Sequence, residues 1–330
     1  MQRLPDYLEP IKQEKESRQR LPEYLKKPII DTEKTKTVRR ILKTKCLNTV
    51  CEGARCPNKS ECYSRNTATF LIMGNVCTRN CRYCNIGTAR PEPLDLDEPK
   101  HVAEAVKELG LKYAVITSVT RDDLPDGGAE HFKNCIDEIR KICDAKIEIL
   151  TPDFRVKYDK LTPSLTDLSQ NDTQSFCSAE SLGEGTKKSL DLIIQAHPEV
   201  FNHNIETVKS LFKTARPQGD YELSIRVLKY IKDNSDIVTK SGLMVGLGEG
   251  IDEIEETLRD LKDAGVDIIT IGQYIQPSKA HLPVAKYYTL EEFEDLRKLA
   301  QKVGFTNYQI DPLVRSSYKA SVSWKDALGK

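Results

Sequence analysis

From about residue 68 onward, short apolar runs alternate with longer stretches in which apolar residues recur at helical spacing. Six runs have the length of β-strands: 68–74, 113–119, 146–151, 199–204, 242–248 and 267–274. Between them, apolar residues recur every three or four positions, which predicts amphipathic helices over 100–110, 129–143, 186–197, 221–233 and 251–265. Strands that alternate with helices indicate a parallel sheet with right-handed crossovers. The pattern fits either an open doubly wound sheet or a partial barrel.

The parts of the chain outside this alternation divide it into three predicted regions. We predict an N-terminal extension over residues 1–66, a core over 67–285, and a C-terminal helix and tail over 286–330. Within the core, residues 160–186 are rich in Ser, Thr, Asn and Gln and lack periodicity, which predicts a long surface insertion. A lid or a docking loop is the functional alternative for that insertion.

The N-terminal extension contains a short echo, RLPDYL at 3–8 and RLPEYL at 20–25. Two copies of six residues are too few to build a repeat architecture. We interpret this region as an irregular arm that lies along the body of the protein.

Charge and composition exclude several classes of protein. The 330 residues include 50 basic and 50 acidic ones, so the formal net charge is zero and indicates neither nucleic acid nor an anionic membrane as partner. No apolar run approaches the roughly 20 residues that span a bilayer. The N-terminal segment also lacks the apolar stretch of a secretory signal. We therefore predict a cytoplasmic protein.

The chain has ten cysteines, and seven of them lie between residues 46 and 84. In a reducing compartment such a cluster indicates metal binding or redox chemistry rather than disulfides. The remaining three are Cys135, Cys143 and Cys177. We interpret all three as ordinary residues, and two of them, Cys135 and Cys143, lie in a helical pattern where cysteine behaves as a small apolar side chain.

Two groups of three cysteines stand out by their spacing. The first is Cys51, Cys56 and Cys62, separated by four and then five residues, and the second is Cys77, Cys81 and Cys84, separated by three and then two. A zinc site at the second group would need a fourth Cys or His at short spacing, and none follows before His101. Three ligands leave one iron of a cubane cluster open, which is useful if a substrate or cofactor binds there.

The second group resembles the signature of the radical S-adenosylmethionine superfamily, because it directly follows a strand and has an aromatic residue before its last cysteine. The resemblance implies a [4Fe–4S] cluster whose open iron binds S-adenosylmethionine, and cleavage of that cofactor to a 5′-deoxyadenosyl radical. It also implies a partial (βα)6 TIM-like barrel with N- and C-terminal extensions, whose site lies at the carboxyl ends of the strands.

Polar residues at predicted strand ends are candidates for contact with this cofactor. One such set follows the strand at 113–119, and another is the glycine-rich end of GLMVGLGE at 242–249. A solvated loop and a tight turn are the respective structural alternatives. The candidate cofactor-binding residues are Tyr83, Thr117, Ser118 and Glu249, with Arg121, Asp122 and Asp123 beside two of them.

The two cysteine groups together resemble the lipoyl synthase family. The resemblance continues through TSVTRDDLPDGGAEHF, FNHNIETV, TKSGLMVGLGE, TIGQYIQPS and PLVRSSY, and covers nearly all of residues 45–320. It implies the insertion of two sulfur atoms at C6 and C8 of an octanoyl chain attached to a lysine of a carrier protein. These C–H bonds are inert to acids and bases, so a radical is required. In this family a second, auxiliary [4Fe–4S] cluster is dismantled to supply the sulfur.

The resemblance also implies the fourth ligand that the first cysteine group lacks. By the family pattern Cys51, Cys56, Cys62 and Ser317, the last in the RSSY motif at 315–318, hold the auxiliary cluster. A serine alkoxide is a harder ligand than a thiolate, and we infer that it lets an iron depart when sulfide is released. Cys46 is the alternative fourth ligand, but it does not belong to the family pattern. Asp311 departs from that pattern, since a small residue is usual before Pro312.

The implied partners are octanoylated lipoyl-carrier domains, namely the glycine cleavage H protein and the E2 subunits of 2-oxoacid dehydrogenases. Reduced ferredoxin or flavodoxin and an iron–sulfur carrier that rebuilds the auxiliary cluster are also implied. Two rival hypotheses remain at this point: another sulfur-inserting enzyme of the biotin synthase type, and a non-enzymatic iron–sulfur carrier or redox sensor.

Overall fold

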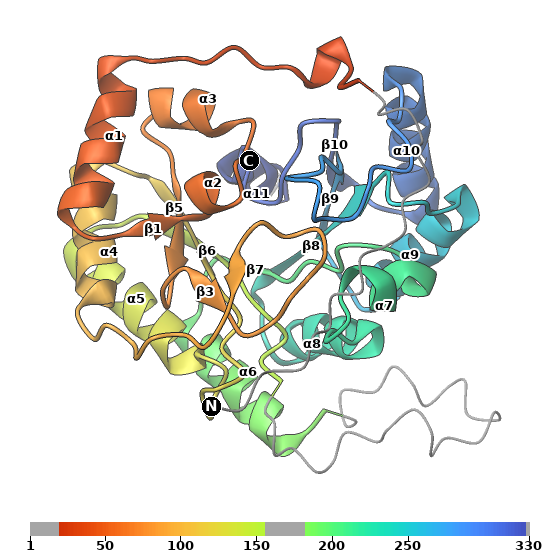
Figure 1. Cartoon of the computed structure of the whole chain (residues 1–330). Helices are drawn as coiled ribbons and strands as arrows, with labels where there is room; N and C mark the ends of the chain where they lie inside the picture. The colour runs from red at the N-terminus through yellow and green to blue at the C-terminus, as the bar shows by residue number, and fades with distance from the viewer. Residues whose placement is uncertain (1–19, 156–181, 328–330) are drawn as a thin grey trace, which may run out of the picture.

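The computed structural model describes residues 20–155 and 182–327, which form a curved sheet surrounded by helices (Figure 1). The sheet has eight strands in the order β1-β2-β5-β6-β7-β8-β9-β10, and every neighbouring pair is parallel except β1 with β2. The strands are β1 (Asn48–Thr49), β2 (Thr69–Ile72), β5 (Tyr113–Ser118), β6 (Lys146–Leu150), β7 (Val200–Asn202), β8 (Val238–Val245), β9 (Ile268–Gln273) and β10 (Asn307–Ile310).

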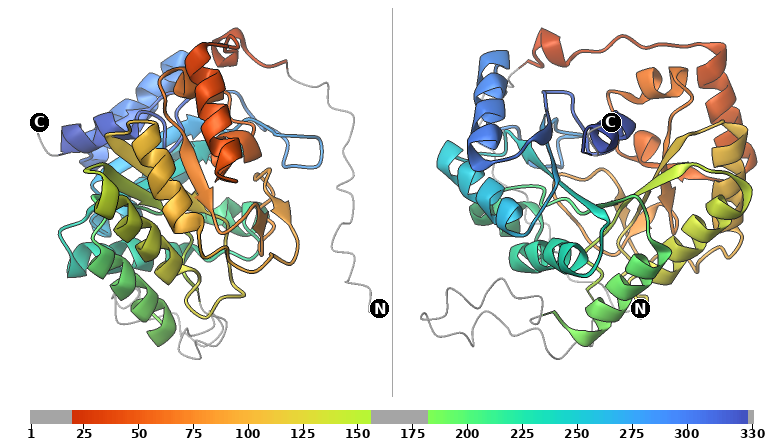
Figure 2. Two further views of the ribbon diagram at one scale, coloured as in Figure 1. Left: turned by 90° about the vertical axis from the view of Figure 1, so that its left-hand side faces the viewer. Right: turned by 180° about the vertical axis from the view of Figure 1, so that it is seen from behind.

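The helices lie mainly on the outside of the curved sheet (Figures 1 and 2). The long outer ones are α4 (Glu98–Glu108), α5 (Ala129–Ile142), α6 (Glu184–Ala196), α8 (Tyr221–Asn234), α9 (Ile251–Asp263) and α10 (Leu290–Val303). The shorter elements and the remaining helices are η1 (Glu23–Leu25), α1 (Glu33–Thr44), α2 (Val50–Gly53), α3 (Lys59–Ser64), β3 (Val76–Cys77), β4 (Gly87–Thr88), η3 (Lys209–Leu211), α7 (Phe212–Ala215) and α11 (Ala320–Ala327).

The predicted partial barrel is confirmed, with β2 and β5 to β9 as its six predicted strands. Three differences concern lengths and edges: β8 begins at Val238 rather than at residue 242, β1 adds an antiparallel strand beside β2, and β10 adds a parallel strand beyond β9. The periodicity did not show β10 because its four residues are mostly half-buried and polar. Residues 160–181 of the predicted insertion and the first RLPxYL copy lie outside the described residues, while 184–186 belong to α6.

Side chains on the two faces of the sheet differ in polarity. Ile147 and Ile149 of β6 are fully buried members of the hydrophobic core, whereas Glu148 between them is a buried charge. In β9, Ile269 and Ile271 likewise alternate with Thr270. Because successive side chains of a strand point to opposite faces, the apolar set packs under the outer helices and the polar set lines the inside of the barrel.

The chain segment before α11 lies against this polar inner face. The Nζ atom of Lys240 in β8 donates to the carbonyl oxygen of Ser316 at 2.6 Å. The hydroxyl of Ser316 in turn donates to Asn204 Oδ1 at 2.8 Å. A Cβ added at Gly272 of β9 would overlap the carbonyl oxygen of Val314, so glycine is required for this close approach. Residues 314–316 therefore fill part of the barrel interior.

This close approach gives a stability prediction. We expect Gly272→Ala to lower the free energy of unfolding by about 1–3 kcal/mol, because the added methyl must displace the backbone at Val314. Urea unfolding of the metal-free protein measures the change. Gly87→Ala is the matched control, since nothing lies within 4 Å of a Cβ at that position. Equal stability of the two variants would contradict the close packing of the C-terminal segment.

Candidate functional site

The loop after β2 carries Cys77, Cys81 and Cys84, and its backbone is arranged around the first of these sulfurs. Cys77 Sγ accepts hydrogen bonds from the backbone N–H of Arg79 at 3.4 Å and of Thr120 at 3.3 Å. Hydrogen bonds of this kind to cysteine sulfur tune the potential of iron–sulfur clusters. They also tie this loop to the segment that follows β5, at the carboxyl ends of the strands.

The three thiols lie close enough to influence one another. Burial, with smaller contributions from the neighbouring Cys81 and Cys77, raises the pKa of Cys84 to about 12. Within the described residues, no group of three His, Cys, Asp or Glu side chains is placed to hold a single metal ion. A cubane cluster differs from a single ion because each thiolate binds its own iron, so its ligands stand farther apart. The donor set and its N–H···S bonds therefore fit a cluster better than zinc.

A buried arginine fixes the conformation of this loop. The Arg79 guanidinium donates to Asp122 from Nε at 2.8 Å and from Nη2 at 2.6 Å. It also donates to Asp153 from Nη1 and Nη2, both at 2.7 Å. Burial by itself raises the pKa of Asp153, but the guanidinium more than offsets this and holds the pKa below its ordinary value. Arg79 thus joins the cysteine loop to the ends of β5 and β6.

This ion-pair network gives a second stability prediction. Lysine has a single charged nitrogen and cannot make two-pronged hydrogen bonds to both carboxylates. We expect Arg79→Lys to lower the free energy of unfolding by about 2 kcal/mol, because charged hydrogen bonds at a buried site are lost. Urea unfolding of the metal-free protein measures it, with Arg82→Lys on the exposed part of the same loop as the control. A loss no larger than that of the control would show that the network is dispensable.

Three buried polar atoms near the same strand ends have no hydrogen-bond partner among the described residues: Ser118 Oγ, His203 Nε2 and Arg216 Nε. The carbonyl oxygen of Thr151 accepts from His203 Nδ1 at 2.9 Å, so Nε2 of a neutral imidazole is an acceptor. Burial, with Arg216 nearby, lowers the pKa of His203 to about 4 and keeps the ring neutral. Unpaired buried polar atoms are costly, and their presence here fits a polar ligand that completes them.

The other predicted cofactor residues have different surroundings. Tyr83 is half-buried between Cys81 and Cys84, and burial raises the pKa of its phenol. The Thr117 hydroxyl donates to the carbonyl oxygen of Leu150 at 2.9 Å. Glu249 accepts from the backbone N–H of Gly246 at 2.6 Å and of Leu247 at 2.9 Å. Thr117 and Glu249 therefore shape strand ends, and a contact of either with the cofactor stays a prediction.

The predicted auxiliary cysteines lie in and beside the short helices α2 and α3. Burial raises the pKa of Cys51 to about 11 and that of Cys62 to about 12, and in both cases neighbouring cysteines of the same group add to the shift. The free thiols are therefore protonated near neutral pH, and thiolates form there when iron replaces the protons. The guanidinium of Arg315, from the RSSY motif, interacts electrostatically with Cys56.

The C-terminal motif reaches this cysteine group through several contacts. Asn58 Nδ2 donates to the carbonyl oxygen of Leu313 at 2.7 Å. The Tyr318 hydroxyl donates to Glu61 at 3.0 Å, and Lys27 forms an ion pair with the same carboxylate. Cys62 and Ser317 line one cavity of about 670 Å³. The structure thus brings Ser317 to the cysteine group, whereas Cys46 is exposed on the turn after α1.

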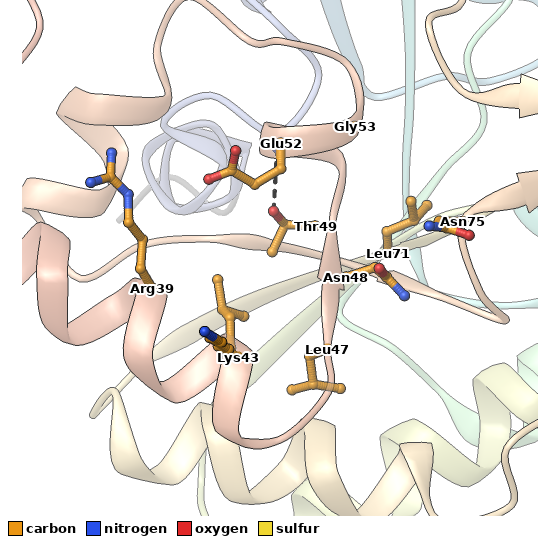
Figure 3. Close-up of a pocket in the computed structure, with 10 residues that line it drawn as sticks. Arg39, Lys43, Leu47, Asn48, Thr49, Glu52, Gly53, Leu71 and Asn75 are labelled. Atoms are coloured by element: carbon orange, nitrogen blue, oxygen red, sulfur yellow. Dashed lines mark hydrogen bonds between the residues drawn. The ribbon is translucent and has the colours of Figure 1, made fainter.

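The two cysteine groups lie on adjoining segments. Asn85, directly after Cys84, donates from Nδ2 to the carbonyl oxygen of Gly53 at 2.7 Å. Gly53 ends α2, two residues after Cys51, and a Cβ there would come within 2.5 Å of Ile86. On its outer side α2 borders a separate cavity of about 460 Å³ that contains no cysteine (Figure 3). Its walls come from α1, β1 and α2, with Arg39, Asn48 and Glu52 among them.

Sequence reasoning missed Arg79, His203, Arg216 and Lys240 as residues of the site. His203 lies in the motif FNHNIETV and Lys240 in TKSGLMVGLGE, both of which carried the family resemblance without a role. A charged or polar residue within an apolar strand was the available signal, because such residues are rarely buried without a partner.

No helix in the described ranges is both long and apolar enough to cross a membrane.

Comparison with known proteins gives one matching family model and many similar chains. The model of the radical SAM superfamily matches residues 71–261. The lipoyl synthase of Caldanaerobacter subterraneus subsp. tengcongensis is 44% identical over 94% of this chain and 99% of its own. The lipoyl synthase of Rubrobacter xylanophilus is 45% identical over 98% of this chain and 91% of its own.

Solved structures of low sequence identity share the fold. Methylornithine synthase is 12% identical with a TM-score of 0.50, and covers 86% of this chain and 84% of its own. HydG, a maturase of the [FeFe]-hydrogenase, is 13% identical with a TM-score of 0.51, and covers 89% of this chain and 60% of its own. At these identities the likeness supports the barrel architecture alone.

Proposed function

The chain belongs to the lipoyl synthase family of the radical SAM superfamily, and from this premise we propose how its residues divide the work. The reaction inserts two sulfur atoms at C6 and C8 of a protein-bound octanoyl-lysine and uses S-adenosylmethionine and two [4Fe–4S] clusters. The observation that carries the proposal is the placement of two cysteine groups on adjoining segments, with Ser317 beside the second of them.

Cys77, Cys81 and Cys84 hold the cluster that binds S-adenosylmethionine. When bound, this cofactor and cluster supply the radical chemistry that breaks unactivated C–H bonds. The chain's own contribution is positional: the Cys77 sulfur is held by two backbone N–H groups, and the loop is held by Arg79.

We assign cofactor contacts to the side chains that have unpaired polar atoms. Ser118 Oγ, His203 Nε2 and Arg216 Nε are buried at or near the strand ends, and Tyr83 lies between two of the cysteine ligands. A neutral His203 accepts a hydrogen bond from a hydroxyl or ammonium group of the ligand. This set is more specific than the predicted Thr117 and Glu249, whose polar atoms bind the backbone of the chain itself.

Cys51, Cys56, Cys62 and Ser317 hold the auxiliary cluster, which is a substrate because its sulfur ends in the product. The contacts of Asn58, Glu61 and Arg315 around this group support the assignment. Thiolate ligands from α2 and α3 and a serine from the C-terminal segment close the site only in the folded chain. The hard serine oxygen is the ligand from which iron departs most readily when sulfide is taken.

The family implies octanoylated lipoyl-carrier domains as the protein substrates. We propose that the glycine cleavage H protein and the E2 subunits of 2-oxoacid dehydrogenases are served, that reduced ferredoxin or flavodoxin donates electrons, and that an iron–sulfur carrier rebuilds the auxiliary cluster. We also propose a cytoplasmic location. It is supported by the cysteines of the described residues, all of which are free thiols, as a reducing compartment keeps them.

Anaerobic incubation with dithionite, S-adenosylmethionine and an octanoyl-lysine peptide tests the function. Mass spectrometry is expected to show the gain of two sulfurs as the reduced dithiol, with the further loss of two hydrogens once the dithiol is oxidised to the cyclic disulfide, together with 5′-deoxyadenosine. Iron and sulfide analysis of the reconstituted protein is expected to give about eight irons per chain, for two four-iron clusters. Formation of deoxyadenosine without any change in peptide mass would refute the substrate, and about four irons would refute the second cluster.

A further inference from the structure

A groove on the face of the barrel that carries α11 leads to the proposed auxiliary ligands. Its walls come from three places: the end of α3, the turn between α4 and β5, and the C-terminal segment with α11. Cys62 and Ser317 lie in its lining, and Leu111 and Trp324 give it an apolar floor. Figure 2 shows α11 at the end of the barrel opposite the loop of β3 and β4.

A ligand bound in the groove cannot reach the loop of Cys77, Cys81 and Cys84 through the barrel interior. Residues 314–316 lie between the groove and the interior, where Gly272 and Gly242 contact Val314 and Ser316. Lys240 donates to the carbonyl oxygen of Ser316 from the same inner face. A ligand in the groove therefore reaches Cys62 and Ser317 but is separated from Cys77, Cys81 and Cys84 by this segment. An octanoyl chain must come near both cysteine groups, so we expect this groove to bind a different partner.

The rim of the groove is basic. Lys112, Lys319 and Lys325 line it, and within the described parts of the chain none of the three has a carboxylate partner. Arg65 adds a fourth cation, although it pairs with Glu61 at 3.1 Å. Val322 on α11 is 49% exposed beside them. Lysines without carboxylate partners beside exposed apolar side chains favour a partner protein with an acidic docking face.

We propose that this groove docks an acidic iron–sulfur carrier protein, which replaces the auxiliary cluster after each turnover. The inference rests on the proposed function, because only a consumed cluster needs replacement. The cluster passes to the chain with no change of oxidation state. Bonds from its irons to the carrier's thiolates break, bonds to the three cysteines and Ser317 form, and the protons that these four groups release return to the carrier's thiols.

The test compares first and later turnovers in Lys112→Glu/Lys325→Glu. The probe is a purified, negatively charged carrier protein loaded with a [4Fe–4S] cluster, and the substrate is the octanoyl-lysine peptide. The variant is expected to complete its first turnover like the wild type, while the rate of carrier-supported later turnovers falls about tenfold or more. Lys187→Glu/Lys188→Glu on α6 is the matched control and is expected to keep both rates.

Reconstitution with ferrous iron and sulfide shows whether the variant still builds its auxiliary site without a carrier, and equal iron content to the wild type is expected. Unchanged carrier-supported turnover in the variant would overturn the proposal. A slower first turnover with a raised KM for an octanoylated carrier domain would also overturn it, because the groove would then dock the substrate. Failure of the wild type to form product in the first turnover would refute the proposed function instead.

Discussion

Cys84→Ala is expected to abolish formation of 5′-deoxyadenosine, while Cys56→Ala keeps part of it and loses sulfur insertion. Removing Cys84 leaves two protein ligands for the cluster that binds S-adenosylmethionine, so both cofactor cleavage and the product fall at least about 100-fold. Cys56 belongs to the other group, where it interacts electrostatically with Arg315 and where Cys62 shares a cavity with Ser317. Its loss removes the sulfur donor while the radical site stays assembled.

Quantification of deoxyadenosine and of sulfur-bearing peptide in the same anaerobic reaction separates the two variants. Cys143→Ala is the control, since this half-buried cysteine at the end of α5 lies outside both groups. Because Asn85 joins the segments of the two groups through Gly53, some loss of cofactor cleavage in Cys56→Ala is expected. Equal loss of both products in Cys56→Ala and Cys84→Ala would contradict separate roles.

Lys240→Met is expected to release the C-terminal segment and empty the auxiliary site. Lys240 and Glu148 are both completely buried inside the barrel, with Nζ 3.0 Å from Oε1 of the carboxylate. Tyr113 and Asn202 also donate to Glu148, at 2.8 and 3.1 Å. Removing the lysine leaves a buried carboxylate without its cation, which costs about 3–5 kcal/mol of unfolding free energy. It also leaves the carbonyl oxygen of Ser316 without its donor.

Three measurements check this prediction. Urea unfolding reports the stability, hydrogen exchange of the metal-free protein reports the protection of residues 314–318, and iron analysis reports the clusters. We expect weaker protection of that segment and about four irons per chain instead of about eight. The double variant Glu148→Gln/Lys240→Met is expected to recover stability, because the uncompensated charge is gone. Full protection of residues 314–318 in Lys240→Met would show that the lysine does not anchor the segment.

Much of the barrel follows from local patterns. The outer helices pair an apolar face with a polar one, so their spacing predicts both type and position, as in α5 and α9. The six predicted strands are recognisable because each is a short apolar run within one local segment. β10 was not predicted because its sequence, NYQI, is mostly polar and half-buried. Its place in the sheet depends on pairing with β9. Such pairing joins residues that are remote in sequence.

The inner face of the barrel shows where the local patterns stop. In the sequence, Glu148 or Lys240 alone looks like a break in an apolar strand pattern, because its ion-pair partner lies 92 residues away. Arg79 has the same character, with carboxylates at Asp122 and Asp153 that only the closed barrel brings to it. The orphaned atoms of Ser118, His203 and Arg216 likewise become visible only when burial is known.

The sequence alone determined the chemistry of this protein, because each cysteine group lies within one short segment and its spacing survives without the fold. It also predicted the barrel, through periods of two and 3.6 residues that depend on near neighbours. The tertiary structure decided how the site is closed. Ser317 lines the same cavity as Cys62 because residues 314–316 cross the barrel interior, where Lys240 binds the carbonyl oxygen of Ser316 and Gly272 leaves room for Val314. Contacts between distant segments depend on packing, and no local spacing encodes them.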